Sequence, residues 1–463
     1  MRYFTGDESG LVKRVVFLPP PLEKKASKKR SHDEEAKADD KKAAKKKQED
    51  EPLNEVTVFG TLDKQAAVQK MAWATVKGER LVVVARQNGK IDFVHPETGA
   101  VVKSFEDKAI AQAQADKPKT NTLRFIGLET TDTHLLACNS DGALTWTPLD
   151  DDTVTELVVI TSLDKATTTG GSTIAGPGTD LNVLRAHPVH RHLLAVAGKD
   201  IDVQIYDLNV LLAGKNGVAA KDTAAPTPTP SKSTSTRTPK PHPRQKQKQG
   251  KLGLIHEAKN VKNDFLDLPQ PVWVNDLQFM DESGTQVAVA THYHQIRLYD
   301  FSKGRRPVLT VEIGKVPLTT LSVGMDYDHV IFTDTRNDVG LFNVRNGKVV
   351  AQLKGFAGAG KATISVPTPT FTTTSSTSSS SNTKGHTLVS VALDRTLRLH
   401  ELDTKYRKLE KKVYLKQRLT ALVVDTDYVV PDREPTEEDK EDEELWDTLE
   451  TVRETKKPRL ARK

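Results

Sequence analysis

Short apolar runs and tight polar turns alternate along most of the chain, and this pattern recurs seven times. After each turn the next run alternates apolar and polar residues with a period of two, which is typical of half-buried antiparallel strands. Asn88-Gly89 and Asp141-Gly142 are expected to supply the positive φ angles of tight hairpin turns. No long helical period separates the units, so each is predicted to be a β-hairpin. The hairpins cover residues 2–17, 81–94, 134–147, 193–208, 286–301, 329–344 and 388–402.

Further apolar segments lie beside these hairpins and raise the expectation to roughly four strands per unit, with units spaced ~40–60 residues apart, as in propeller blades. Tyr206-Asp207 and Tyr299-Asp300 stand where a WD repeat carries its Trp-Asp pair. One blade cannot bury both faces of its sheet, so the ring has to close to complete a core. The pattern predicts an all-β, seven-bladed WD-repeat β-propeller over residues 1–425. The clearest added segments are 182–188, 272–280, 318–325 and 348–355.

The two ends of the chain predict how the ring closes. Residues 411–424, "KKVYLKQRLTALVV", supply apolar segments that no hairpin follows, and the first hairpin has no strand before it. We expect "RLTALVV" to pair with "RYFTG", so that both ends build one blade.

Three segments interrupt the pattern and explain why the hydrophobic fraction is only 36%, below the ~45–50% of a globular chain. Residues 20–52, 213–268 and 367–385 are rich in Lys and Glu or in Pro, Ser and Thr, and are expected to be disordered surface insertions.

Residues 426–463 are expected to form an acidic and then basic tail. Leu445, Trp446 and Leu449 have the spacing of a short amphipathic helix, which would fit a groove on a partner or dock back onto the propeller. Lys456, Lys457 and Arg459 lie in "KKPRLARK", which resembles a nuclear-import signal.

Charge and cysteine content narrow the class of protein. The net charge is +6 and the pI is near 9.0, with the charge concentrated in the insertions and the tail. Such runs are either solvated tails or a salt-sensitive attraction for nucleic acid. Cys138 is the single cysteine, which excludes a disulfide framework and a multi-cysteine zinc site. No run approaches the ~18 apolar residues of a membrane span and no secretory signal is visible, so we expect a soluble intracellular protein.

Two motifs resemble an enzyme's phosphate-binding loop and a metal site, but neither has the residues or setting that such a site requires. "GFAGAGKAT" (355–363) resembles a phosphate-binding loop, but Ala362 occupies the position of the hydroxyl that binds magnesium, and the next segment reads as a strand instead of a helix. We interpret it as a connection between blades. The histidines of 187–192 and 291–295 lie in turns and are expected to be exposed residues without a metal. With no catalytic set in view, the chain is predicted to be a non-catalytic protein without cofactor or metal.

The order of several segments also resembles one family. "VWVNDLQFM", "THYHQIRLYD", "LKGFAG", "LDRTLRLH", "KVYLKQRLTAL" and the acidic "DEELWDTLE" before a basic end are similar to the nucleolar WD-repeat factors of large-ribosomal-subunit assembly, a family that includes the fungal Nop-seven-associated protein. The resemblance is strongest from about residue 270 onward and does not cover the insertions at 23–51 and 213–268.

The resemblance implies a scaffold in the nucleus and nucleolus that acts as a monomer within a larger complex. It implies contacts with ribosome-assembly proteins and pre-rRNA, no membrane, and release by a AAA-type ATPase. The alternative is a generic WD-repeat adaptor, such as a subunit of a ubiquitin ligase or a chromatin complex. Contacts with partners are expected from the hairpin tip His292, Tyr293 and His294 and from basic residues near the propeller edges. These basic residues are Arg305, Arg306, Arg336, Arg395, Lys416 and Arg418.

Overall fold

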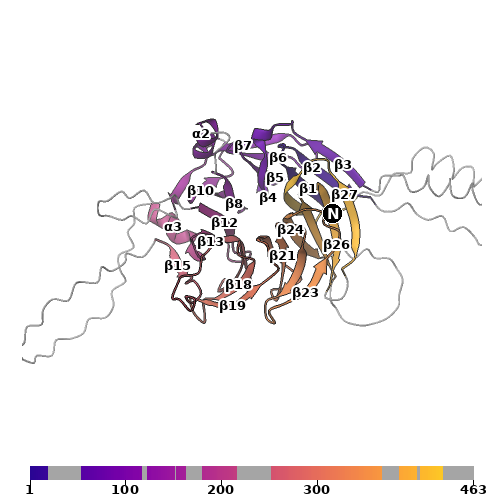
Figure 1. Cartoon of the computed structure of the whole chain (residues 1–463). Coiled ribbons are helices and arrows are strands. Elements are labelled where there is room, and N and C mark those ends of the chain that lie inside the picture. Colours follow the sequence, from indigo (N-terminus) through magenta and orange to yellow (C-terminus); the bar gives the residue numbers. More distant parts are fainter. Residues whose placement is uncertain are drawn as a thin grey trace, which may run out of the picture.

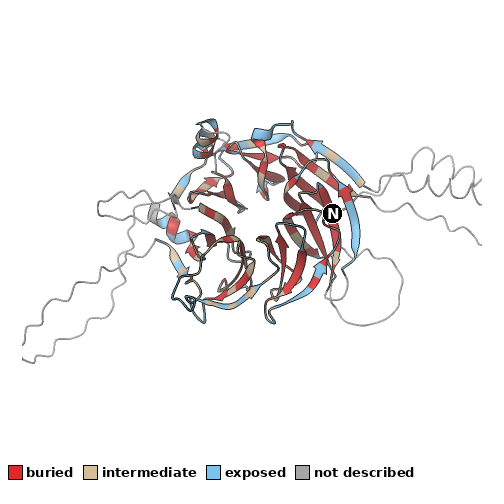
Figure 2. Ribbon diagram, viewed as in Figure 1, coloured by how far each residue is buried: buried red, intermediate tan, exposed pale blue. Residues whose placement is uncertain are grey.

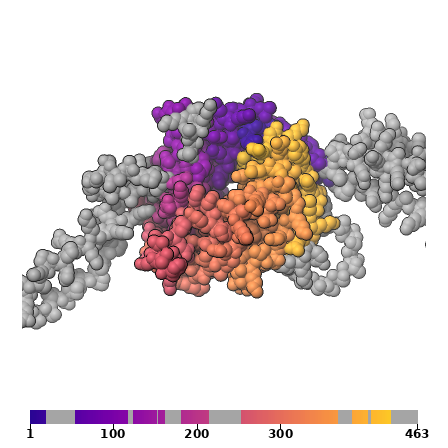
Figure 3. Space-filling view, viewed as in Figure 1, coloured from indigo at the N-terminus to yellow at the C-terminus, as the bar shows by residue number. Residues whose placement is uncertain are grey.

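The chain forms a closed ring of seven four-stranded antiparallel sheets, shown by a computed structural model (Figure 1). The predicted seven-bladed β-propeller is therefore confirmed. In the space-filling view the blades follow one another in sequence order, and the last blade contacts the first (Figure 3). The structure describes residues 1–18, 54–116, 123–151, 153–162, 180–215, 252–367, 385–403 and 407–430.

The four strands of each blade follow one another from the central channel to the rim. Blade 1 consists of β28 (Leu419–Asp425), β1 (Arg2–Asp7), β2 (Val12–Phe17) and β3 (Asn54–Phe59). Blade 2 consists of β4 (Val68–Val76), β5 (Glu79–Arg86), β6 (Lys90–Val94) and β7 (Val101–Glu106). Blade 3 consists of β8 (Phe125–Thr130), β9 (His134–Asn139), β10 (Ala143–Pro148) and β11 (Val159–Ser162). Blade 4 consists of β12 (Asp180–Ala186), β13 (Leu193–Lys199), β14 (Gln204–Asp207) and β15 (Leu254–Glu257).

The remaining blades have the same order from inner to outer strand. Blade 5 consists of β16 (Val274–Phe279), β17 (Gln286–Thr291), β18 (Gln295–Asp300) and β19 (Pro307–Glu312). Blade 6 consists of β20 (Leu318–Val323), β21 (His329–Asp334), β22 (Val339–Asn343) and β23 (Lys348–Leu353). Blade 7 consists of β24 (Gly360–Pro367), β25 (His386–Ala392), β26 (Thr396–Leu402) and β27 (Leu409–Tyr414). Helical turns occur in connections, as η1 (Lys64–Ala66), α2 (Lys108–Asp116) and α3 (Leu208–Lys215).

The core is divided among the seven junctions between neighbouring blades. Each of seven clusters of buried apolar side chains draws its members from two adjacent blades. The middle strands are buried, whereas the outer strands are largely exposed (Figure 2). No blade has a core of its own, so the ring is the unit that folds.

Ring closure takes the predicted form. β28 pairs antiparallel with β1, with Tyr3 opposite Val424 and Thr5 opposite Leu422. The first residues of the predicted tail also contact the ring, because the Tyr428 carbonyl accepts a hydrogen bond of 2.7 Å from the amino group of Met1.

A β-bulge near the start of every inner strand is the most regular feature of the ring that the pattern did not predict. In each case one residue of the inner strand has no partner in the second strand. In ring order these bulged residues are Thr420, Gln69, Ile126, Asn182, Asn275, Thr319 and Lys361.

At five junctions the bulged side chain hydrogen-bonds the backbone of the next inner strand, and we call these bonds the bulge clasps. The two bulged residues without a clasp among the described residues are Ile126, which has no polar side-chain atom, and Lys361. The clasps run from Thr420 Oγ1 to the Val68 carbonyl (2.7 Å), from the Phe125 amide to Gln69 Oε1 (2.8 Å), from Asn182 Nδ2 to the Val274 carbonyl (2.8 Å), from Asn275 Nδ2 to the Leu318 carbonyl (2.5 Å) and from Thr319 Oγ1 to the Gly360 carbonyl (3.2 Å).

Two details of the sequence interpretation were wrong. Gly89 and Gly142 adopt φ angles of 87° and 81°, but Asn88 and Asp141 do not have positive φ. The turns therefore have three residues, with glycine alone in the left-handed region.

The insertion predicted at 213–268 also extends too far. Residues 252–268 are described, and β15 within them pairs with β14 and packs Leu254 beside the core. A four-residue strand is too short to give a periodic signal. The other predicted insertions and the tail beyond residue 430 lie outside the described residues, apart from their first or last residues.

Candidate functional site

Antiparallel strand order places two kinds of connection at the same end of every blade. These are the turns between the second and third strands and the connections from each outer strand to the next inner strand. We call this end the turn face. Loops on one face of a rigid propeller can present side chains from several blades to one partner.

Four predicted basic residues come together on the turn face of blades 6, 7 and 1. Arg336 lies in the β21–β22 turn, Arg395 in the β25–β26 turn, and Lys416 and Arg418 lie between β27 and β28. Two further exposed cations join them, Lys354 before β24 and the bulged Lys361. We call these six residues the basic arc.

The basic arc keeps most of its charge available. Among the described residues, the one ion pair that it forms joins Arg418 to Glu8 at 3.7 Å, with both side chains more than half exposed. A surface pair at this distance contributes little to stability. Arg395 hydrogen-bonds the Tyr414 hydroxyl at 3.3 Å. The arc is therefore a surface that can contact phosphate groups.

The backbone holds parts of the arc in fixed positions. Asp334 Oδ1 accepts the amide protons of Arg336 (2.9 Å) and Asp338 (2.8 Å), which closes the β21–β22 turn. Arg395 and Lys416 have φ angles of 68° and 66°, in the left-handed region that favours glycine. Arg395 and Lys416 therefore occupy backbone conformations in which glycine would be less strained.

The other two predicted cations lie elsewhere and have a different role. Arg305 and Arg306 lie in the β18–β19 connection, at the opposite ends of the strands. Arg305 pairs with Glu257 at 2.6 Å, and Arg306 donates to the Asn260 carbonyl at 3.3 Å. These bonds fasten blade 5 to residues at and just after the outer strand of blade 4, so the structure does not bring this pair into the arc.

The predicted hairpin tip is on the turn face of blade 5, the blade before the first blade of the arc. His292 stacks on Trp273 with 4.0 Å between ring centroids, and the Lys199 ammonium lies 5.0 Å from the Trp273 ring. Tyr293 packs edge-on against His292. The tip is thus an ordered, partly exposed aromatic cluster.

His187 differs from the expectation that histidines 187–192 are exposed. It is fully buried, its Nδ1 accepts the amide protons of Val189 (3.2 Å) and His190 (2.8 Å), and its Nε2 donates to the Asp281 carbonyl at 2.9 Å. Because both nitrogens are occupied, His187 is a structural residue that joins blade 4 to blade 5. Among the described residues, no three His, Cys, Asp or Glu side chains are grouped so that they could hold a metal ion.

The segment 355–363 connects blades, as its composition indicated. Gly355 has a φ of 98°, Phe356 is buried and stacks on His400, and residues 360–367 form β24. Residues 360–367 form a strand and no helix follows Lys361, so the helix N-terminus that would hold a phosphate is missing.

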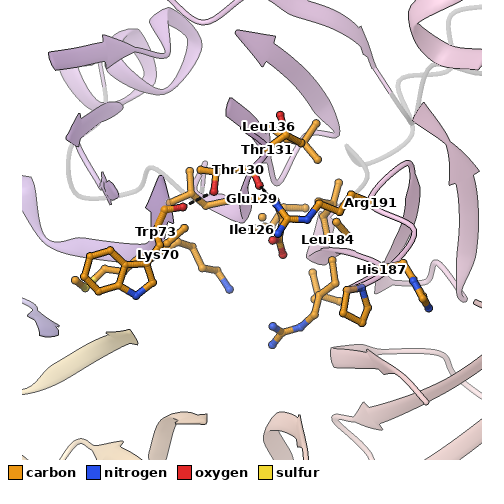
Figure 4. A pocket seen from close by; sticks show the side chains of 18 of the residues that line it. Lys70, Trp73, Ile126, Glu129, Thr130, Thr131, Leu136, Leu184, His187 and Arg191 are labelled. Atoms are coloured by element: carbon orange, nitrogen blue, oxygen red, sulfur yellow. Dashed lines mark hydrogen bonds between the residues drawn. The ribbon is translucent and has the colours of Figure 1, made fainter. Parts of the chain in front are cut away.

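A polar cavity of about 440 Å³ lies in the central channel, between the inner strands of blades 2, 3 and 4. Lys70, Glu129 and Arg191 point into it (Figure 4). Arg185 also lines the cavity and binds Asp276 of blade 5, with 3.1 Å and 3.2 Å between its guanidinium and the two carboxylate oxygens.

The ionisable residues in and beside the cavity are buried or bonded to neighbouring blades. Burial raises the pKa of Glu129 and lowers that of Lys70, which disfavours the charged form of each. Asp276 also accepts the Leu321 amide proton at 2.8 Å, so one carboxylate links the inner strands of blades 4, 5 and 6. Sequence reasoning missed these residues because they are single polar positions within apolar strands.

Comparison with known proteins gives relatives that match the chain over most of its length, although no family model matches. WD repeat-containing protein 74 of Bos taurus is 28% identical over 412 residues, which cover 87% of this chain and 85% of the relative. Ribosome biogenesis protein NSA1 of Yarrowia lipolytica is 27% identical, with 87% and 88% covered, and nsa1 of Schizosaccharomyces pombe is 23% identical, with 86% and 89% covered.

Among solved structures, the computationally designed Ika8 protein aligns with 80% of this chain and 85% of its own at 12% identity and a TM-score of 0.44. Within the described residues, no helix has the length and apolar character needed to cross a membrane. The homologues of this chain are WD repeat-containing protein 74 in animals and ribosome biogenesis protein NSA1 in fungi, at 23–28% identity over most of its length.

Proposed function

We propose that this protein is a non-catalytic factor in the assembly of the large ribosomal subunit that binds pre-ribosomal particles through its propeller surface. The observation that carries the proposal is the basic arc, which gathers exposed cations from three adjacent blades on one face of a fold whose homologues are named as ribosome biogenesis proteins. In this proposal the arc binds pre-rRNA and other surfaces of the ring bind assembly proteins.

The geometry supports phosphate binding without sequence recognition. The arc side chains are long, exposed cations fixed to turns, and the blades that carry them are held by ring closure. Contacts of this kind position a protein on RNA and are weakened by salt, because bound counterions are released when cations meet phosphates. Bases would be selected elsewhere in the particle.

Two further parts of the proposal concern the tail, and the monomeric state and the release step follow the family resemblance. Lys456, Lys457 and Arg459 would direct the protein to the nucleus and nucleolus, and the helix with Leu445, Trp446 and Leu449 would bind a partner. The protein would act as a monomer within the particle until a AAA-type ATPase releases it. These tail residues lie outside the described part of the chain.

The test is to purify the tagged full chain under gentle conditions and to sequence the RNA and proteins that accompany it. We expect precursors of large-subunit rRNA together with ribosome-assembly proteins. Recovery of a ubiquitin-ligase scaffold or chromatin complex without pre-rRNA would overturn the proposal in favour of a generic adaptor. The control is the same purification with Arg336, Arg395, Lys416 and Arg418 changed to alanine, which should retain less pre-rRNA.

A further inference from the structure

The connection between β15 and β16, residues 258–273, exposes large apolar side chains on the turn face. At its tip Phe265 is 94% exposed, Leu266 63% and Leu268 56%. Scattered surface leucines are ordinary, but three exposed apolar side chains within four residues of one loop tip indicate a binding surface.

The tip is held in shape by its own hydrogen bonds. Asp264 Oδ1 accepts the amide protons of Leu266 and Leu268, each at 2.9 Å, and the Asp264 amide donates to the Leu268 carbonyl at 3.1 Å. Asn263 Nδ2 donates to Asp267 Oδ1 at 2.8 Å. The tip therefore keeps its shape without packing Phe265 against the ring.

The base of the connection is tied to blade 5. Asn260 Oδ1 accepts a hydrogen bond of 3.1 Å from the buried Arg297, and Asn260 Nδ2 donates to the Gln270 carbonyl at 2.5 Å. The loop is thus a preorganised projection on a rigid support, and binding through it would lose little conformational entropy.

We propose that residues 263–268 are a docking element that inserts Phe265, with Leu266 and Leu268 beside it, into an apolar pocket with a basic rim on a protein partner. Within residues 263–268 the charged side chains are Asp264 and Asp267, which would repel RNA phosphates and would complement Lys or Arg residues around a protein pocket. The exposed Lys262 directly precedes this segment. A single aromatic anchor in a desolvated pocket is the usual centre of such an interface. The proposal does not depend on which particle the partner belongs to.

The experiment places the photo-crosslinking residue p-benzoylphenylalanine at position 265 of the full chain in cells. We expect one protein adduct, with the crosslinked peptide in an apolar pocket bordered by Lys or Arg. That partner is then purified and its affinity measured for the wild-type chain and for Phe265→Ala. Loss of the anchor is expected to weaken binding about 30-fold or more.

The matched control is Val429→Ala, because Val429 is also a large exposed side chain (82%) but lies beyond β28 of blade 1. It should leave the affinity unchanged, and neither variant should change the thermal unfolding midpoint. An adduct to RNA, an adduct to a second copy of this chain, no adduct, or a partner whose affinity Phe265→Ala leaves intact would each overturn the proposal.

Discussion

Neighbouring inner strands are joined in different ways at two junctions of the ring, the one between blades 4 and 5 and the one between blades 7 and 1. At the first, the bulged Asn182 clasps the next inner strand, and an apolar loop projects above it. At the second, the bulged residue is Lys361, which is exposed and has no clasp to any described residue, and four of the arc's cations surround the junction. At these two junctions an apolar loop accompanies the clasp of Asn182, and exposed cations accompany the unclasped Lys361.

The junction between blades 7 and 1 is stabilised by a buried ion pair and hydrogen bonds instead of a clasp. Lys13 of β2 is 3% exposed, and its ammonium lies 2.8 Å from Asp7, 2.6 Å from the Leu415 carbonyl and 2.5 Å from Gln417 Oε1. A buried cation in blade 1 therefore replaces the clasp and leaves Lys361 free to face a ligand. At this junction Lys13 therefore contributes to stability, whereas Lys361 supplies charge for binding.

The largest effect should follow from removing that buried lysine. Lys13→Ala leaves the Asp7 carboxylate buried without its cation, and breaking such a pair costs about 3–5 kcal/mol. Unfolding in urea should report a loss of this size. A loss below about 1 kcal/mol would mean that the closing junction does not depend on Lys13.

Removing the arc charges should mainly affect RNA binding. With Arg336, Arg395, Lys416 and Arg418 all changed to alanine, affinity for a large-subunit rRNA fragment should fall on the order of 100-fold, and the dependence of log affinity on log salt should become shallower by about 3. Titration at several salt concentrations measures both. Arg306→Ala is the control at a predicted cation outside the arc and should leave both quantities nearly unchanged, and an equal loss there would contradict the role of the arc.

Equivalent bulge positions should respond differently in the two junctions. Asn182→Ala breaks the clasp to Val274 and should destabilise the ring by about 1–2 kcal/mol, because a buried carbonyl loses its donor. Lys361→Ala should change stability by less than about 0.5 kcal/mol and should reduce RNA affinity. Paired denaturation curves test the first claim, and equal losses of stability would remove the distinction between the junctions.

One substitution in the arc should increase stability. Arg395→Gly places glycine where φ is 68°, which relieves backbone strain and should raise stability by about 0.5–1 kcal/mol while weakening RNA binding. A thermal melt and an RNA titration on the same variant separate the two results. Lower stability would show that the Tyr414 contact outweighs the strain.

The fold could be predicted from the chain because each hairpin carries its own local signal, and because the unmatched ends identified β28 and β1 as partners. The short β15 could not, since its pairing depends on a strand outside the predicted insertion. The candidate site was predicted in part. Arg336 and Arg305 look alike in sequence, and only the alternation of strand direction places Arg336 on the turn face and Arg305 at the opposite ends of the strands. Lys361 lies in the segment interpreted as a connection between blades, but its bulge depends on the neighbouring strand.

Ring closure by the two ends has a consequence for how this protein is made. The strand that covers the edge of Tyr3 and Phe4 is Leu419–Asp425, which is synthesised only after all the other strands of the ring. Until then β1 presents an unpaired edge, the feature by which nascent chains aggregate or recruit chaperones. A chain truncated before Leu419 would therefore leave this edge unpaired, so the ring cannot close until β28 has been synthesised.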